Sequence, residues 1–94
     1  MKFEWHPPKA ESNLTKHGVS FEEAQDAFED DCGVVIRDDR NSIGETRYRL
    51  IGGSQLRLLV VSYTIRQDEL GQEVFRLISA REAEDWEKRK YHEY

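Results

Sequence analysis

Between residues 33 and 79, hydrophobic and polar positions follow patterns that predict β-strands. Four strands are expected, at Gly33–Arg37, Thr46–Gly53, Leu56–Arg66 and Glu73–Ser79. Stretches rich in Asp, Asn, Ser and Gly separate them, as is typical of turns. The third segment contains the run Leu58-Leu59-Val60-Val61, which is apolar on both faces, so we expect this strand inside the sheet.

Two elements are predicted ahead of these strands. Lys2–Trp5 alternates polar and apolar residues and predicts a short first strand. Pro7 and Pro8 predict the start of a helix that runs to about His17, because proline suits the first helical turn. Gly18 can adopt the left-handed conformation that ends a helix.

Two more helices are predicted from residue pairs at capping-box spacing. Ser20 and Glu23 form the first pair, and an apolar stripe continues that helix to about Asp30. Ser79 and Glu82 form the second pair, which predicts a final helix directly after the last strand. The resulting order, β-α-α-β-β-β-β-α, indicates an α+β fold. We expect one domain over residues 1–94, with an antiparallel sheet of four to five strands, two N-terminal helices and one C-terminal helix.

The net charge of −5 argues against a protein that binds polyanions over its whole surface. Seven arginines lie between Arg37 and Arg76, so an anion site is expected in the strand-rich part. Cys32 is the only cysteine, which excludes an internal disulfide, and its apolar neighbours predict a small buried side chain. No segment has the apolar length of a signal peptide or membrane span, so we expect a cytoplasmic protein.

Four blocks of sequence cover nearly the whole chain. They are Phe3–Ala24, which includes K-H-G-V-S-F-E-E-A, Glu45–Gly52 (E-T-R-Y-R-L-I-G), Leu58–Arg66 (L-L-V-V-S-Y-T-I-R) and Arg76–Tyr91, which begins R-L-I-S-A-R-E-A. In order and spacing they resemble the BrnT toxins of type II toxin–antitoxin systems. One departure is His6, which stands where these toxins usually carry Asp. Because His6 precedes Pro7, it is expected at the N-cap of the first helix, where imidazole is a poor cap.

The resemblance implies a RelE-like fold and a ribonuclease that inhibits translation. It also implies a protein partner, the antitoxin BrnA, a small ribbon-helix-helix protein that binds DNA and neutralises the toxin. The toxin itself is then expected to meet RNA as its substrate, and DNA only through the antitoxin.

Three arginines are candidates for stabilising the charge that builds on phosphate oxygens during RNA cleavage, since guanidinium pairs bidentately with phosphate. Arg66 ends the central strand, Arg76 lies in the last strand, and Arg81 is expected in the first turn of the last helix. If they serve this purpose, their guanidinium groups should be solvated without substrate. The alternative is that each arginine pairs with a carboxylate of the chain.

Four other residues are weaker candidates. His17 could act in acid–base catalysis and Lys16 could hold a phosphate, although both suit the end of a helix without any such role. Tyr63 and Tyr91 could stack on bases, with core or helix-docking roles as the stronger alternative. No metal-binding spacing, phosphate-binding Gly loop or cofactor motif is present.

The leading hypothesis is therefore a metal-independent endoribonuclease toxin that is held inactive by its antitoxin. A second hypothesis, which the acidic balance favours, is a catalytically weak module that binds the antitoxin and modulates its DNA binding. A third, a small dimeric structural domain, explains none of the matched polar positions.

Overall fold

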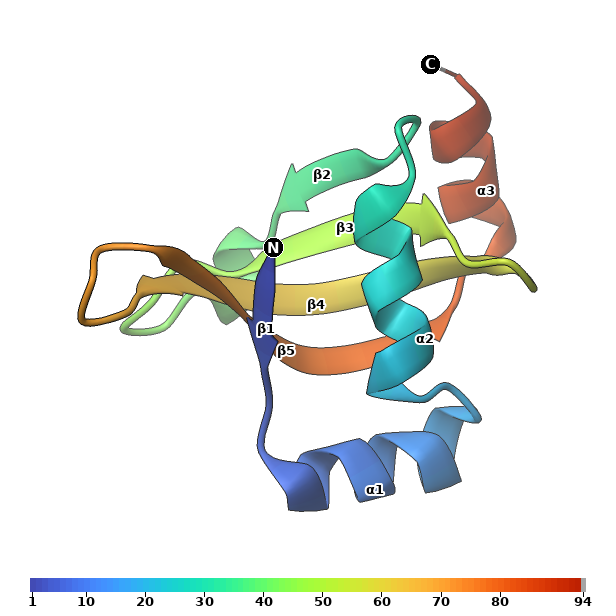
Figure 1. Ribbon diagram of the computed structural model, residues 1–94. Helices are drawn as coiled ribbons and strands as arrows, with labels where there is room; N and C mark the ends of the chain where they lie inside the picture. Colours follow the sequence, from blue (N-terminus) through green and yellow to red (C-terminus); the bar gives the residue numbers. More distant parts are fainter. Residues whose placement is uncertain (94) are drawn as a thin grey trace.

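The computed structural model, which describes residues 1–93, contains one five-stranded sheet with helices on both sides (Figure 1). The strands are β1 (Lys2–Glu4), β2 (Val34–Arg37), β3 (Tyr48–Gly53), β4 (Leu58–Gln67) and β5 (Glu73–Glu82). Their spatial order is β1-β5-β4-β3-β2. Neighbouring strands are antiparallel except β1 and β5, which are parallel. The predicted α+β fold is confirmed.

The central position predicted for Leu56–Arg66 is also confirmed. β4 pairs with β3 on one side and β5 on the other, and Leu59, Val60 and Val61 are at most 3% exposed. The strand begins at Leu58 rather than at Leu56, which is 80% exposed. Leu56 lies in a turn whose backbone N–H groups donate to the Ser54 hydroxyl.

The first helix, α1 (Pro7–His17), has the predicted bounds. Gly18 ends it with φ 70°, and His6 stands at its N-cap without a side-chain hydrogen bond. Asn13 fixes the helix to the sheet. Its buried amide donates to the carbonyls of Val19 and Ala80 and accepts from the Ala80 N–H, with N–O distances of 2.8–3.0 Å.

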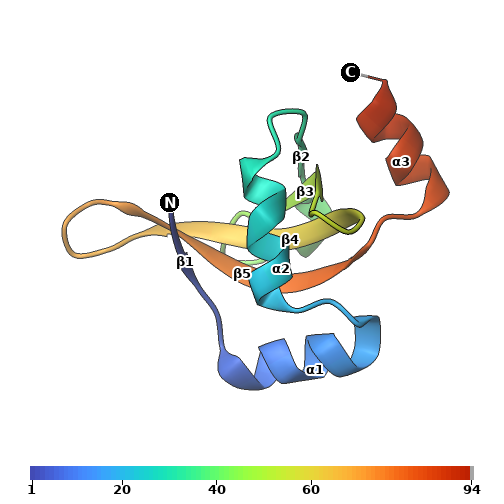
Figure 2. The same cartoon turned by 45° about the vertical axis from the view of Figure 1, so that its right-hand side comes forward.

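The second helix, α2 (Phe21–Asp26), begins as predicted, because the Ser20 hydroxyl accepts the Glu23 N–H at 3.0 Å. It ends before Asp30 and tightens into a 3₁₀ turn, η1 (Ala27–Glu29), as helix ends often do. Figures 1 and 2 show α2 lying across one face of the sheet. A second 3₁₀ turn, η2 (Asp39–Asn41), follows β2.

The predicted start of the last helix is wrong. Ser79 and Glu82 lie in β5, because this stretch pairs with Leu59–Ser62 of β4 and the ladder bonds outweigh a local cap. The helix, α3 (Asp85–His92), has Glu84 at its N-cap and begins five residues later than predicted. Its first turn is closed by Glu87, whose carboxylate accepts the backbone N–H of Glu84 at 2.8 Å.

The sheet separates two hydrophobic clusters. The larger one packs α2 and η1 against the inward residues of the sheet, among them Leu50, Val61 and Ala80. The smaller one lies on the other face and joins Ile51 and Val60 to the Tyr91 ring of α3. Aromatic packing also holds β1 in place, because the Phe3 ring centroid lies 6.0 Å from that of Phe75 on β5 and 5.0 Å from that of Phe28 in η1.

Cys32 does not have the buried position expected from its apolar neighbours. Its backbone N–H donates to the Asp30 carboxylate at 2.9 Å, and this turn directs the thiol outward. Among residues 1–93, no helix combines the length and the apolar character needed to cross a bilayer.

Candidate active site

The face of the sheet opposite α2 carries the polar residues of the strands. Because side chains alternate between faces, the neighbours of the buried row Leu50–Val61–Ala80 point to this second face. Pairing across β3, β4 and β5 places Arg49, Ser62 and Ser79 in one row. The next row holds Ile51, Val60 and Arg81.

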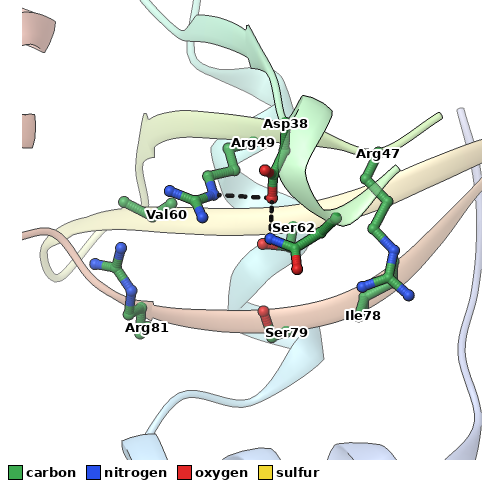
Figure 3. Close-up of a pocket in the computed structure, with 9 residues that line it drawn as sticks. Asp38, Arg47, Arg49, Val60, Ser62, Ile78, Ser79 and Arg81 are labelled. Carbon is green, nitrogen blue, oxygen red and sulfur yellow. Dashed lines mark hydrogen bonds and ion pairs between the residues drawn. The ribbon is translucent and has the colours of Figure 1, made fainter. Parts of the chain in front are cut away.

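A cavity of about 260 Å³ opens over these rows (Figure 3). It is lined by Asp38, Asn41, Arg47, Arg49, Val60, Ser62, Ile78, Ser79 and Arg81. Three of these nine residues are arginines, and Asp38 is the one acidic residue among them. The cavity therefore has a positive balance although the chain as a whole is acidic.

Arg81 is held by a carboxylate below the cavity. Its Nη1 and Nη2 atoms donate to the two oxygens of Glu87 at 2.7 and 2.8 Å. Glu87 is 1% exposed. Burial acts to raise the pKa of Glu87, but hydrogen bonds from Arg81 and from the Glu84 backbone outweigh it and lower the pKa overall. The ion pair thus links the start of α3 to the site.

Arg49 is held more loosely, by Asp38 at an Nε–Oδ2 distance of 3.3 Å. The Asn41 amide also donates to Asp38, at 2.9 Å. These hydrogen bonds, that of Asn41 first, lower the pKa of Asp38 and keep it ionised at neutral pH. The side chains of Arg49 and Arg81 are 35% and 30% exposed, so solvent and ligands can reach them.

Arg47 lies at the other end of the cavity, beside Ile78 (Figure 3). Its backbone is fixed by Ser42 Oγ, which accepts the Arg47 N–H at 2.9 Å, and by the Asp38 N–H, which donates to the Arg47 carbonyl at 2.8 Å. Its buried Nε has no hydrogen-bond acceptor within residues 1–93. A buried donor in this state favours the arrival of an acceptor from outside the chain.

Of the three arginines proposed from the sequence, Arg81 lines this cavity, but on β5 rather than on a helix. Arg66 and Arg76 lie further along β4 and β5 and pair with Glu4, with N–O distances of 2.7 Å for Arg66 Nε and 3.1 Å for Arg76 Nη1. Hydrogen bonds from Arg66, then Arg76, lower the pKa of Glu4 to about 2 despite partial burial. All three guanidinium groups pair with carboxylates, as in the alternative interpretation.

The other four candidates do not line the cavity. Lys16 and His17 lie in the last turn of α1. Tyr63 is 4% exposed inside the larger cluster, where burial raises its pKa. The Tyr91 hydroxyl donates to Asp30 at 2.6 Å, and this hydrogen bond is the main cause that raises the pKa of Tyr91 to about 12.

Arg47 and Arg49 line the cavity but were not predicted from the sequence. They are two residues apart, at the start of a predicted strand, and a period of two places such residues on one face. That signal was present in the block E-T-R-Y-R-L-I-G. Within residues 1–93, no three His, Cys, Asp or Glu side chains are grouped as metal ligands.

Three arginines gathered on one open sheet face can bind an anion such as a phosphate group. A comparison with models of known protein families identifies the family of the chain. The model described as "Ribonuclease toxin, BrnT, of type II toxin-antitoxin system" matches residues 5–87. The chain belongs to the BrnT family, so it is a ribonuclease toxin of a type II system, and such a system includes a protein antitoxin. No curated protein sequence matches the chain.

Proposed function

We propose that this protein is a metal-independent endoribonuclease whose cleavage site is the cavity lined by Arg47, Arg49 and Arg81. The convergence of three guanidinium groups on one sheet face is the observation that carries the proposal. Cytoplasmic RNA is the substrate class, and its cleavage stops translation.

The reaction is a transfer at one phosphate. The 2′-oxygen attacks phosphorus, the bond to the 5′-oxygen breaks, and a 2′,3′-cyclic phosphate and a 5′-hydroxyl result. Arg49 and Arg81 would stabilise the negative charge that builds on the phosphate oxygens, since preorganised donors of this kind are often the largest single contribution to catalysis. The hydroxyls of Ser62 and Ser79 provide further donors to the same oxygens.

Few residues of the cavity could transfer the protons of this reaction, from the 2′-hydroxyl and to the 5′-oxygen. Asp38 can accept the 2′-hydroxyl proton, but its lowered pKa makes it a weak base at neutral pH. No histidine is among the nine described residues that line the cavity. Cleavage would therefore depend on electrostatic stabilisation by arginine more than on acid–base catalysis.

We further infer that the antitoxin is a BrnA-like ribbon-helix-helix protein that neutralises the toxin by covering this cavity. An acidic segment of the partner would pair with the same arginines that bind phosphate. DNA would then contact the complex only through the antitoxin.

The proposal is tested by RNA cleavage in excess EDTA with the parent, Arg49→Ala and Arg89→Ala, a matched control on the exposed face of α3. Arg49 is suited to this test because Asp38 retains its hydrogen bond from Asn41 after the substitution. We expect Arg49→Ala to lose roughly a hundredfold to a thousandfold in rate, and Arg89→Ala to retain it. Equal rates for all three proteins would contradict the proposed site.

One observation favours the alternative, a catalytically weak module that binds the antitoxin and modulates its DNA binding. Arg49 and Arg81 are already paired with carboxylates, which weakens their attraction for phosphate. A parent protein that binds its antitoxin but neither cuts RNA nor arrests growth would establish this alternative.

A further inference from the structure

A second cavity, of about 250 Å³, adjoins the first on the same side of the molecule. His6 and Lys9 line it from the start of α1, Arg76 from β5, and Arg47 from the segment before β3. Arg47 and Ile78 line both cavities. The two hollows are therefore adjacent and meet at the guanidinium group of Arg47.

We propose that this second cavity binds a neighbouring phosphate of single-stranded RNA whose cleaved phosphate occupies the first cavity. The inference rests on the proposed function and extends it from one phosphate to a strand of several nucleotides. Proteins that bind single strands commonly follow the backbone with a positively charged groove.

The charges fit this ligand. Lys9, Arg47 and Arg76 bring three cations to the second cavity, and Glu45, which is exposed, is the one acidic residue that lines it. Glu4 pairs with Arg76, but it is shared with Arg66, so one carboxylate faces two cations. A positive balance therefore remains for an anion.

The hydrogen-bonding groups fit as well. The buried Nε of Arg47 has no acceptor within the described residues, and phosphate oxygens in either cavity would be within the reach of this guanidinium. The imidazole of His6 makes no cap bond to α1 and lines the cavity instead. The His6 imidazole and the Arg47 guanidinium can thus both donate to a ligand in this cavity.

The span fits a strand of nucleotides rather than one phosphate. Arg81 and Arg76 are five residues apart on β5, which corresponds to about 16 Å at the usual rise per strand residue. Ile78 lies between them, at the point where the pairing of β4 with β5 shifts its register and where the two cavities meet. One phosphate group cannot reach both arginines, so a ligand that contacts both must be a strand with more than one phosphate.

The test measures binding of a DNA dinucleotide and a DNA hexanucleotide, which lack the 2′-hydroxyl and are not cleaved. The proteins are the parent, Lys9→Gln, Lys9→Arg and Lys16→Gln, a matched control on α1 outside both cavities. Lys9 is exposed, so its substitution should leave the fold unchanged. Each phosphate contact to a single strand contributes about −0.7 to the slope of log affinity against log salt.

For the hexanucleotide, we expect the salt dependence of Lys9→Gln to be less steep than that of the parent, with a slope less negative by about 0.7. For the dinucleotide, the slope should be unchanged. Lys9→Arg should restore the slope, and Lys16→Gln should resemble the parent. Equal slopes for Lys9→Gln and Lys16→Gln would overturn the inference, as would a parent that shows no salt-dependent binding. Binding is measured here without cleavage. A parent protein that shows these slopes but does not cut RNA would therefore contradict the proposed function and still support the second cavity as a phosphate site.

Discussion

Arg81 and Glu87 stabilise one another, and this pairing changes what a single substitution measures. Glu87 is 1% exposed and accepts two hydrogen bonds from Arg81. Loss of the guanidinium would leave a buried carboxylate without this cation, a change that typically costs about 3–5 kcal/mol. Although solvent reaches it, the Arg81 guanidinium is therefore already paired with a carboxylate in the absence of substrate, contrary to the expectation from the sequence.

Arg81→Ala should accordingly lower both stability and activity. The double variant Arg81→Ala/Glu87→Ala should recover part of the lost stability, because the uncompensated charge is removed, but should stay inactive on RNA. Urea unfolding and RNA cleavage of both variants check this. A double variant less stable than the single one would contradict the pairing argument.

Substitution of His17 should have little effect on catalysis, because His17 lies outside the cavity and no histidine lines it. We expect His17→Ala to cut RNA within about threefold of the parent, well under the hundredfold typical of a lost acid–base group. A hundredfold loss with unchanged stability would restore His17 as a catalytic residue.

Glu4 should make the protein sensitive to acid. Hydrogen bonds from Arg66 and Arg76 lower its pKa from 4.5 to about 2. A lowered pKa in the folded state contributes stability that is fully present above 4.5 and is lost as pH falls toward 2. The free energy of unfolding of Glu4→Gln should therefore depend less on pH in this window than that of the parent, with Glu11→Gln as an exposed control on α1.

At the scale of elements, the start of α1 both begins a helix and lines the second cavity. His6 occupies the N-cap without capping the helix. Pro7 and Pro8 carry no N–H, and the Lys9 and Ala10 N–H groups already donate to the His6 carbonyl, so an aspartate side chain finds no free donor in the first turn. We therefore expect His6→Asp to stabilise the protein by about 0.3–1 kcal/mol, through the favourable interaction of an anion with the N-terminus of α1. The same change places a negative charge beside Lys9 and Arg76 and should weaken binding of the DNA hexanucleotide.

Thermal unfolding and the binding assay would be run on the same preparation of His6→Asp. An unchanged or lower melting temperature would mean that a negative charge at position 6 does not stabilise α1. Unaltered hexanucleotide binding would count against the second cavity as a phosphate site.

At the scale of the molecule, the sheet keeps the packed face and the open face apart. Gly52 on β3 lies directly under η1, where an added Cβ would be 2.7 Å from the Ala27 carbonyl oxygen. At Gly53 the nearest atom is an Asp30 carboxylate oxygen at 3.4 Å, an ordinary contact. Helix and sheet thus approach each other most closely on the face away from the cavity.

We expect Gly52→Ala to destabilise the protein by about 1–3 kcal/mol through overpacking, and Gly53→Ala to have a much smaller effect. Because the clash lies on the far side of the sheet, cleavage per folded molecule should be unchanged. Urea titration gives the stability, and cleavage without denaturant gives the activity. Equal stability of the two variants would show that η1 can move away from β3.

The sequence by itself determined the features that depend on neighbouring residues. Pro7 and Gly18 bounded α1, the Ser20 hydroxyl started α2, and the apolar run at Leu58 placed β4 inside the sheet. These predictions held because caps and alternation act within a few residues. The resemblance to BrnT toxins was likewise readable from the order of four sequence blocks and was confirmed.

Only the tertiary structure decided which arginines meet. Arg49 and Arg81 are 32 positions apart and share a cavity because the ladders through β4 set their register. The same ladder pairing extended β5 through Ser79, where a local cap motif predicted a helix, and so moved Arg81 from a helix to the sheet. Pairing between distant strands depends on their mutual register, and a local pattern carries no information about it.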